Sequence, residues 1–229
     1  MNINQSGIVS KRRWIKVLFF ALLVKPIVFI ILGLNIRNRK GLPQLGPSII
    51  AANHTSHLDA LVLMSLFPLS QIHNVRPVAA ADYFMCNQWI AWFAVNCLDI
   101  IPFDRLDHSS KNSLFKKCYD ALDQQQIIIL FPGGTRSSPK QSISELKRGI
   151  YHLIHERPQA TVIPVLLQGL GKALPKGTAL FVPFNCDVMI DDIIAIAPDD
   201  TARSFVNKLE MRYQALQEFC VTDCGDSTD

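Results

Sequence analysis

Short apolar runs alternate with longer amphipathic segments over most of the chain, and this alternation is the strongest constraint on the fold. The apolar runs have the length and the Ile and Val content of buried strands, and the segments between them are long enough for helices. We expect strands at 48–52, 75–80, 98–101, 127–131, 161–167, 178–182 and 186–190, and helices at 57–67, 83–95, 109–125, 142–155 and 200–219. The pattern predicts an α/β fold with a mostly parallel sheet flanked by helices.

An almost continuous apolar segment, residues 14–34, precedes this pattern. Its length is close to that of a membrane-spanning helix. Lys25 would then lie near the bilayer centre, and Pro26 removes a helical hydrogen bond. We therefore expect two short apolar pieces, 14–24 and 27–34, joined at a polar elbow. No small-residue cleavage site follows, which disfavours a cleaved signal peptide. A soluble helix buried in the core would explain the apolar character but not the basic flanks.

The positive charge of the chain is concentrated at its N-terminus. Residues 1–40 hold eight Lys and Arg and no Asp or Glu, whereas the remainder holds 15 basic and 19 acidic residues. A nucleic-acid-binding protein should have a basic body, so we expect no nucleic-acid partner. Basic clusters on both sides of the apolar segment can lie on one anionic surface. We predict a membrane anchor over 1–40, followed by a domain over 41–229 at the cytoplasmic face of a membrane, such as the bacterial inner membrane.

Cysteines are scattered and form no ligand cluster. The six lie at positions 86, 97, 118, 186, 220 and 224, and none makes a CxxC pair. Zinc sites need clustered ligands, and disulfide scaffolds are usually shorter and richer in cysteine. We expect free thiols in a reducing compartment and no metal site. No oligomeric state follows from the sequence.

The stretch "NHTSHLD" at 53–59 follows an apolar run and combines two imidazoles with a carboxylate. Ser56 and Asp59 have the spacing of a helix N-cap and its capping box, so Asp59 could simply cap a helix. His54 lies at the carboxyl end of a predicted strand, where ligands bind in open α/β sheets. From one helical turn further on, Asp59 can orient the His54 ring, whose other nitrogen can accept a proton from an attacking hydroxyl. We expect His57 to be exposed and give it no role.

The stretch "FPGGTRSSP" at 131–139 also follows an apolar run. Gly134 and Thr135 can present backbone N–H groups to an anion near a helix start, and Arg136 adds a guanidinium. Alone, the stretch would be read as a tight turn with a solvent-facing arginine.

These stretches occur in the order of four motifs of the glycerolipid acyltransferases, the family that makes phosphatidic acid from lysophosphatidic acid. His54-x4-Asp59 resembles the first motif. The other three are resembled by "DIIPFDR" (99–105), "FPGGTRS" (131–137) and "VIPV" (162–165), and "ELKRGIYHLI" (145–154) resembles the Lys-x-Gly helix start that follows the third. The resemblance covers residues 48–170. Asp99 stands where the second motif usually begins with Gly, and Gly133 where the third usually has Glu.

The resemblance implies an O-acyltransferase whose donor is an acyl thioester of coenzyme A or acyl carrier protein, with membrane lipids as partners. His54 would be the general base and Asp59 its orienting partner. Arg105 and Arg136 would bind the phosphate of a lysophosphatidic acid-like acceptor, assisted by Gly134 and Thr135. A thioester carries its own activation, so no cofactor and no metal are required.

Other functions remain open at this point. Gly133 leaves the anion site more positive and roomier, which suits another acceptor, such as an aminolipid, a glycolipid or a pigment-like alcohol. Asp99 adds a negative group near Arg105 that could hold it or compete for it. A non-catalytic lipid-binding protein is disfavoured by the intact pair of His54 and Asp59. A serine hydrolase is disfavoured because the chain has no G-x-S-x-G elbow.

Overall fold

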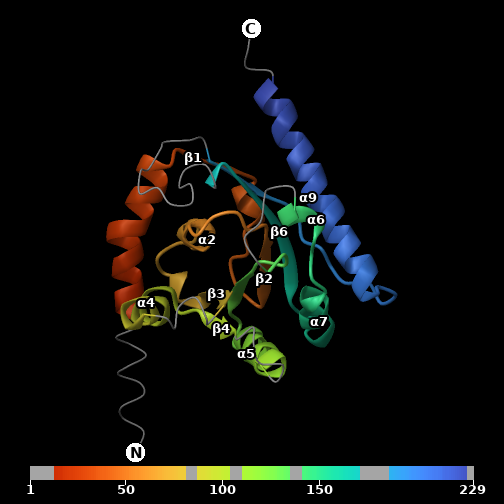
Figure 1. The fold of residues 1–229 in the computed structure, drawn as a ribbon, viewed down its shortest axis with the longest axis horizontal. Helices are drawn as coiled ribbons and strands as arrows, with labels where there is room; N and C mark the ends of the chain where they lie inside the picture. The colour runs from red at the N-terminus through yellow and green to blue at the C-terminus, as the bar shows by residue number, and fades with distance from the viewer. Residues whose placement is uncertain (1–12, 81–86, 104–109, 135–140, 171–185, 226–229) are drawn as a thin grey trace, which may run out of the picture.

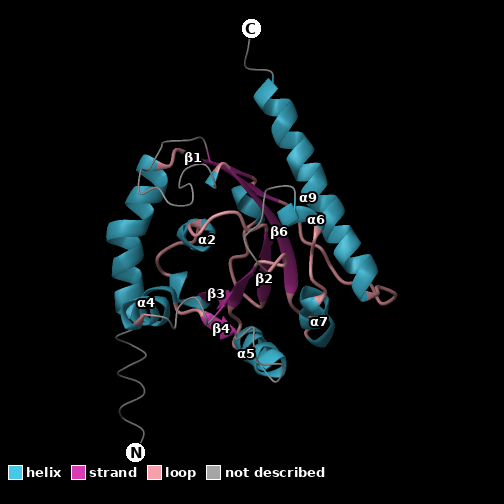
Figure 2. Ribbon diagram, in the orientation of Figure 1, coloured by secondary structure: helices cyan, strands magenta, loops and turns pink. Residues whose placement is uncertain are grey.

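The computed structural model of the chain describes residues 13–80, 87–103, 110–134, 141–170 and 186–225 (Figure 1). A seven-stranded sheet lies between two layers of helices, with the strand order β1-β7-β6-β2-β5-β3-β4 (Figure 2). The strands are β1 (Leu34–Arg37), β2 (Ser48–Ala52), β3 (Val75–Ala80), β4 (Ile101–Phe103), β5 (Ile127–Leu130), β6 (Thr161–Gln168) and β7 (Cys186–Ile190). All neighbours pair in parallel except β6 and β7. The predicted α/β fold with a mostly parallel sheet is confirmed.

Helices cover both faces of this sheet. The α-helices are α2 (Asp59–Ser65), α4 (Gln88–Phe93), α5 (Ser110–Asp123), α6 (Gln141–Ser144), α7 (Gly149–Glu156) and α9 (Ala202–Gly225). Because side chains alternate along a strand, Ile50 and Ala52 of β2 pack with α2 and the N-terminal helix, while Ile49 and Ala51 pack with α5, α7 and α9 (Figure 1). Two apolar cores, one on each face, therefore hold the sheet.

Residues 13–31 form one continuous helical segment, here called the N-terminal helix. It contains the π-helical stretches η1 (Phe20–Val24) and η2 (Ile27–Ile31), between which Lys25 and Pro26 keep right-handed helical dihedrals. Lys25 Nζ donates to the carbonyl of Phe67, just beyond the end of α2, at 2.7 Å. The expected division into two pieces with an elbow is therefore wrong: the wider π turns accommodate the proline within the helix.

Part of the predicted anchor belongs to the sheet. Residues 34–37 form β1, which pairs in parallel with β7. One side of the N-terminal helix is buried in the core through Phe20, Val24 and Val28, and Leu32, just beyond its end, is buried with them. Among the residues that the structure describes, no helix has both the length and the apolar character needed to cross a membrane.

Two other boundaries differ from expectation. The strand expected at 98–101 begins only at Ile101, because α4 continues through the π-helical η5 (Ala94–Leu98). The helix expected at 142–155 is divided into α6 and α7. The strand expected at 178–182 lies outside the described residues.

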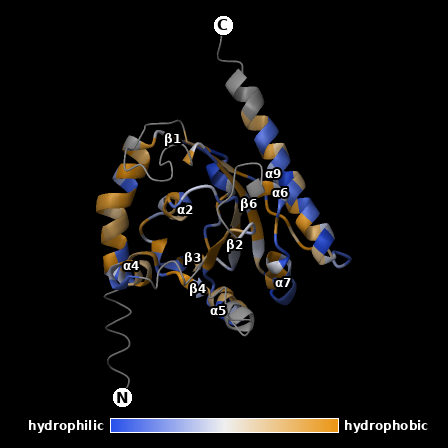
Figure 3. Ribbon diagram, viewed as in Figure 1, coloured by the Kyte–Doolittle hydropathy of each residue, from blue (hydrophilic) through white to orange (hydrophobic). Residues whose placement is uncertain are grey.

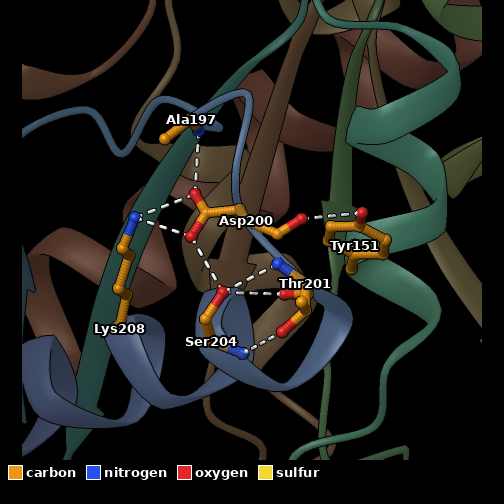
Figure 4. A network of polar contacts seen from close by, with 6 residues as sticks. All are labelled: Tyr151, Ala197, Asp200, Thr201, Ser204 and Lys208. Carbon is orange, nitrogen blue, oxygen red and sulfur yellow. Dashed lines mark hydrogen bonds and ion pairs between the residues drawn. The ribbon is translucent and has the colours of Figure 1, made fainter.

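A polar network fixes the start of α9 against α7 (Figure 4). Thr201 and Ser204 exchange hydrogen bonds between backbone N–H and side-chain hydroxyl, at 2.9 and 3.1 Å. Asp200 accepts from Lys208 Nζ at 2.8 Å, and its backbone carbonyl accepts from the hydroxyl of Tyr151 at 2.9 Å. The Lys208 hydrogen bond, followed by a backbone N–H, holds the pKa of Asp200 below its ordinary value. The reciprocal bonds of Thr201 and Ser204 make them the cap of α9.

Four cysteine side chains that the structure describes are buried, and those of Cys97, Cys118 and Cys186 have free thiols; the fourth is Cys220. Burial raises the pKa of Cys118 to about 12. For Cys97, Cys118 and Cys186 the prediction of free thiols is confirmed, and all four residues contribute as small apolar groups of the core.

Candidate active site

The candidate site lies at the carboxyl edge of the parallel strands. β2 and β5 are parallel neighbours, with Ala51 opposite Leu130, so the residues that follow these two strands meet at the same edge. The His54 ring, after β2, stacks on the Phe131 ring, after β5, with centroids 4.2 Å apart and planes inclined by 22°. The strand order thus joins two motifs that are far apart in the sequence.

Asn53 fixes the start of the turn that carries His54. Its side-chain amide is buried and makes two hydrogen bonds with the backbone of Leu167 in β6, donating to the carbonyl at 2.9 Å and accepting from the N–H at 2.7 Å. The amide thereby extends the pairing of β2 with β6 beyond the last residue of β2. Local sequence predicts no role for Asn53, because only its partner on β6 reveals one.

The predicted contact between His54 and Asp59 is present. Nδ1 of His54 lies 2.8 Å from Oδ2 of Asp59. The same Oδ2 accepts the backbone N–H groups of Thr55 at 2.7 Å and Ser56 at 2.9 Å. The Asp59 side chain is fully buried, whereas that of His54 is 21% exposed. The carboxylate therefore holds both the turn and the imidazole ring.

The capping expectation for this turn is partly wrong. α2 begins at Asp59 and is preceded by Leu58, so Ser56 is not its N-cap. The Ser56 hydroxyl accepts the N–H of Leu58 at 3.3 Å, while Asp59 accepts the N–H of Ser56. Asp59 thus makes the backbone contact expected of a capping residue as well as the contact with His54. His57 is exposed, as expected.

These contacts indicate the tautomer of His54. The Asp59 oxygen already accepts two backbone N–H groups, so we assign the ring proton to Nδ1, which donates to it. Nε2 then carries a lone pair, and no described residue forms a hydrogen bond with it. A neutral imidazole held in this way can accept a proton at Nε2.

The glycine-rich turn after β5 is closed by a hydrogen bond from the N–H of Gly134 to the carbonyl of Phe131 at 2.9 Å. Gly134 has φ +76°, in the left-handed region that favours glycine. The N–H of Lys147 binds the carbonyl of Pro132 at 2.9 Å, and its Nζ would lie 2.5 Å from a β-carbon added at Gly134. An exposed ammonium group therefore lies against the turn. Lys147 begins the Lys-x-Gly pattern, but the sequence alone predicts no role for it.

The structure brings His54, Asp59 and Gly134 to one edge of the sheet. Arg105, Thr135 and Arg136 lie outside the described residues. No group of three or more His, Cys, Asp or Glu within the described ranges is arranged to hold a metal ion.

The two residues that depart from the family pattern, Asp99 and Gly133, have different surroundings. Asp99 has φ +53°, a conformation that glycine adopts freely and Asp tolerates. Its carboxylate lies 3.3 Å from the guanidinium of Arg76, which also donates to its backbone carbonyl. Asp99 therefore has a partner other than the predicted Arg105. Gly133 lies in the turn between Pro132 and Gly134 and supplies no carboxylate there.

Fold and site together define an α/β protein with a histidine–carboxylate pair and a glycine-rich turn at the carboxyl edge of its sheet. A family model described as "Acyltransferase" matches residues 33–168, which is more than half of the chain, and the chain belongs to this family.

Curated relatives are similar over part of their length. The chain is 27% identical to the chloroplast 1-acyl-sn-glycerol-3-phosphate acyltransferase of Arabidopsis thaliana, over 63% of this chain and 38% of the relative. It is 30% identical to the 1-acyl-sn-glycerol-3-phosphate acyltransferase of Bacillus subtilis (strain 168), over 60% of this chain and 63% of the relative. The chain thus matches less than two thirds of the length of these relatives.

A solved structure has the same fold. The 1-acyl-sn-glycerophosphate (LPA) acyltransferase PlsC from Thermotoga maritima superposes with a TM-score of 0.66 at 17% identity, covering 93% of this chain and 88% of that one. At this identity the likeness shows the fold.

Proposed function

We propose that the protein is an O-acyltransferase that moves a fatty acyl group from a thioester of coenzyme A or acyl carrier protein to a hydroxyl of a lysophosphatidic acid-like acceptor. One observation carries the proposal: His54 is held by the buried Asp59 at 2.8 Å while its Nε2 has no hydrogen-bond partner in the described part of the chain. The named activity of the curated relatives supports the choice of acceptor.

In the proposed reaction the acceptor hydroxyl gives its proton to Nε2 of His54, and its oxygen attacks the thioester carbonyl carbon. The tetrahedral intermediate then collapses as the carbon–sulfur bond breaks. The leaving sulfur takes the proton back from His54, which yields an ester and a free thiol. Asp59 stabilises the imidazolium formed between these two proton transfers, and needs no proton itself.

The acceptor phosphate is assigned to the glycine-rich turn. Arg105 and Arg136 are its proposed ligands by family resemblance, with a backbone donor at Thr135. The N–H of Gly134 already donates to the carbonyl of Phe131, so Gly134 shapes the turn rather than donating to the phosphate as predicted. The structure adds Lys147, whose ammonium lies against Gly134 and has no carboxylate partner among the described residues. A lysine acts as a point charge for phosphate, whereas arginine provides the bidentate fork.

We place this chemistry at the cytoplasmic face of an anionic membrane, such as the bacterial inner membrane, because the proposed acceptor is a membrane lipid and the proposed thioester donors are cytoplasmic. The N-terminal helix supports the assignment. Opposite its buried side it exposes an apolar row formed by Trp14, Leu18, Leu22 and Ile30. A helix that is apolar on its outer side and flanked by basic residues suits the membrane interface.

The proposal is tested by acyl transfer with purified protein on lipid vesicles, using acyl-CoA and acyl carrier protein thioesters in turn. Acceptors should include lysophosphatidic acid, a lysophospholipid with a larger headgroup and an uncharged alcohol of matched chain length. We expect the product of lysophosphatidic acid to dominate by mass spectrometry. Failure to acylate any acceptor, with free thiol released at the background rate, would support a non-catalytic lipid-binding protein instead.

Gly133 favours a second candidate, in which the acceptor is another polar lipid. A glutamate at this position would add a carboxylate to the turn against which the Lys147 ammonium lies, and residues 131–134 hold no acidic side chain. In that case more acylated product would form from an aminolipid, glycolipid or other alcohol added to the acceptor panel than from lysophosphatidic acid. Gly133→Glu would then move the acceptor preference toward lysophosphatidic acid. An unchanged preference in Gly133→Glu would remove this candidate.

A further inference from the structure

The short helix α4 exposes large apolar side chains to solvent. Trp89 is 82% exposed and Trp92 is 53% exposed, and Ile90 and Val95 are also exposed. Residues 87–98 contain no charged side chain. Exposed aromatic side chains at this density on one short helix mark an interaction surface.

α4 is attached to the N-terminal helix. The ring of Phe93 packs edge-on against that of Phe19, with centroids 5.0 Å apart. Figure 1 shows α4 at the end of the N-terminal helix where the chain begins, and Figure 3 shows that helix as apolar along most of its length. The apolar side chains of α4 and the outer row of the N-terminal helix therefore belong to two elements that pack together.

All three tryptophans of the chain lie on these two elements. Trp14 is 67% exposed and joins Trp89 and Trp92 on the outside of the molecule. Tryptophan is normally mostly buried in water-soluble domains, but its amphipathic ring is favoured at the boundary between lipid headgroups and acyl chains.

We propose that α4 is a second membrane-contacting element, which inserts Trp89 and Trp92 into the interface of an anionic bilayer beside the N-terminal helix. The inference rests on the proposed function, which places the protein at a membrane. Charge selects the occupant. Residues 1–40 hold eight basic and no acidic side chains; Lys16 is buried, but Arg13, Arg39 and Lys40 are exposed. These exposed charges attract anionic lipid and would repel the same surface of a second copy.

A second contact also orients the site. β3 ends at Ala80, at the same edge of the parallel sheet as β2, and α4 begins only eight residues later, at Gln88. The edge that carries His54 is therefore linked by a short connection to an element held in the interface. A protein bound to the membrane through the N-terminal helix alone can rotate about the axis of that helix. A second contact through α4 prevents this rotation and fixes the orientation of the site.

Tryptophan fluorescence tests the proposal in the full chain. In Trp14→Phe only Trp89 and Trp92 emit. On vesicles of phosphatidylcholine and phosphatidylglycerol we expect their emission to shift to the blue and to be quenched by lipids brominated near the headgroup. If this variant sediments with the vesicles while its emission is neither shifted nor quenched, α4 does not contact the membrane.

Binding of the full chain provides the second measurement. The double substitution Trp89→Gln and Trp92→Gln should weaken vesicle binding by about tenfold or more, since each large side chain loses its transfer out of water. Met211→Gln on α9 removes a side chain of comparable exposure, 67%, and should leave binding unchanged. Equal binding by the double variant and the parent would overturn the proposal.

Two controls distinguish loss of membrane contact from loss of acyl transfer and from dissociation of a dimer. Activity of the double variant on a short-chain acceptor dissolved in detergent should match that of the parent, so that a failure of the acyl transfer itself is recognised independently. Light scattering without lipid should give the same mass for both proteins. A dimer that the double substitution dissociates would identify the surface as a contact between two copies and overturn the membrane assignment.

Discussion

Asp59→Asn offers the most informative perturbation of the candidate site, because the two side chains have the same shape and differ in charge. Oδ2 of Asp59 accepts from His54, Thr55 and Ser56, whereas Oδ1 is buried with no hydrogen-bond partner. The amide oxygen of Asn must take the Oδ2 position, since an NH₂ there would face two backbone N–H groups. The turn and the tautomer of His54 are then retained, and the charge is lost.

The expected loss of activity follows from this geometry. A carboxylate and an imidazolium with centres about 4 Å apart interact by about 4 kcal/mol at an effective dielectric constant of about 20. Losing that stabilisation at the transition state lowers kcat about 10³-fold, within the range of about 10²–10⁴ that general-base catalysis supplies. KM for the acceptor should change little, because no acceptor ligand is touched.

The substitution should also lower stability modestly. It places an amide NH₂ where Oδ1 has no partner, and a buried unsatisfied donor costs about 1–3 kcal/mol. For a chain of this size Tm should fall by roughly 2–12 °C, so the variant remains folded at assay temperature.

The assay is steady-state acyl transfer on vesicles, with thermal unfolding measured on the same preparation. Asp123→Asn is the control, because Asp123 is a half-exposed carboxylate that pairs with Arg157 away from the site and should leave kcat unchanged. A kcat for Asp59→Asn within tenfold of the parent, in a folded protein, would refute the role given to this carboxylate.

Three further predictions concern the turn, its lysine and α9. Gly134→Ala should cost about 1–2 kcal/mol of stability through its left-handed backbone and displace Lys147, raising KM for a phosphate-bearing acceptor; unfolding and kinetics measure both. Lys147→Gln should raise that KM several-fold and leave an uncharged acceptor unaffected; equal effects on both acceptors would contradict the phosphate role. Asp200→Asn should lower the unfolding free energy at pH 7 by about 1 kcal/mol. Because the pKa of Asp200 is lowered in the folded state, this stabilisation is full above its ordinary value near 4 and is lost as the pH falls through the folded value. Urea unfolding measured at a series of pH values should therefore show that the difference in unfolding free energy between the parent and Asp200→Asn disappears in acid.

Local pattern was sufficient to predict most of the sheet. The strands at 48–52 and 186–190 have the predicted bounds, because each is a short apolar run between turns. β1 was missed because Leu34–Arg37 continues an apolar segment that, read alone, is typical of a membrane anchor. Its pairing with β7 is a tertiary contact that no local pattern encodes.

In the candidate site, too, some residues could be predicted from local sequence and others depend on tertiary contacts. Asp59 is predictable because it lies five residues after His54 and just inside the expected helix, and that spacing is visible in the sequence. Phe131 and Asn53 act through neighbours that the strand order supplies, β2 beside β5 and β2 beside β6. Lys147 was overlooked because a tertiary hydrogen bond to Pro132 brings it to the turn, at the point where the predicted helix is interrupted.

The most direct test of the central claim, that Nε2 of His54 accepts the proton of the acceptor hydroxyl, is single-turnover acyl transfer by His54→Gln bound to vesicles. With thioester and lysophosphatidic acid both saturating, the account predicts a rate about 10³-fold or more below that of the parent, with acceptor binding retained. A folded, substrate-bound His54→Gln that transfers the acyl group at the parent rate would contradict it.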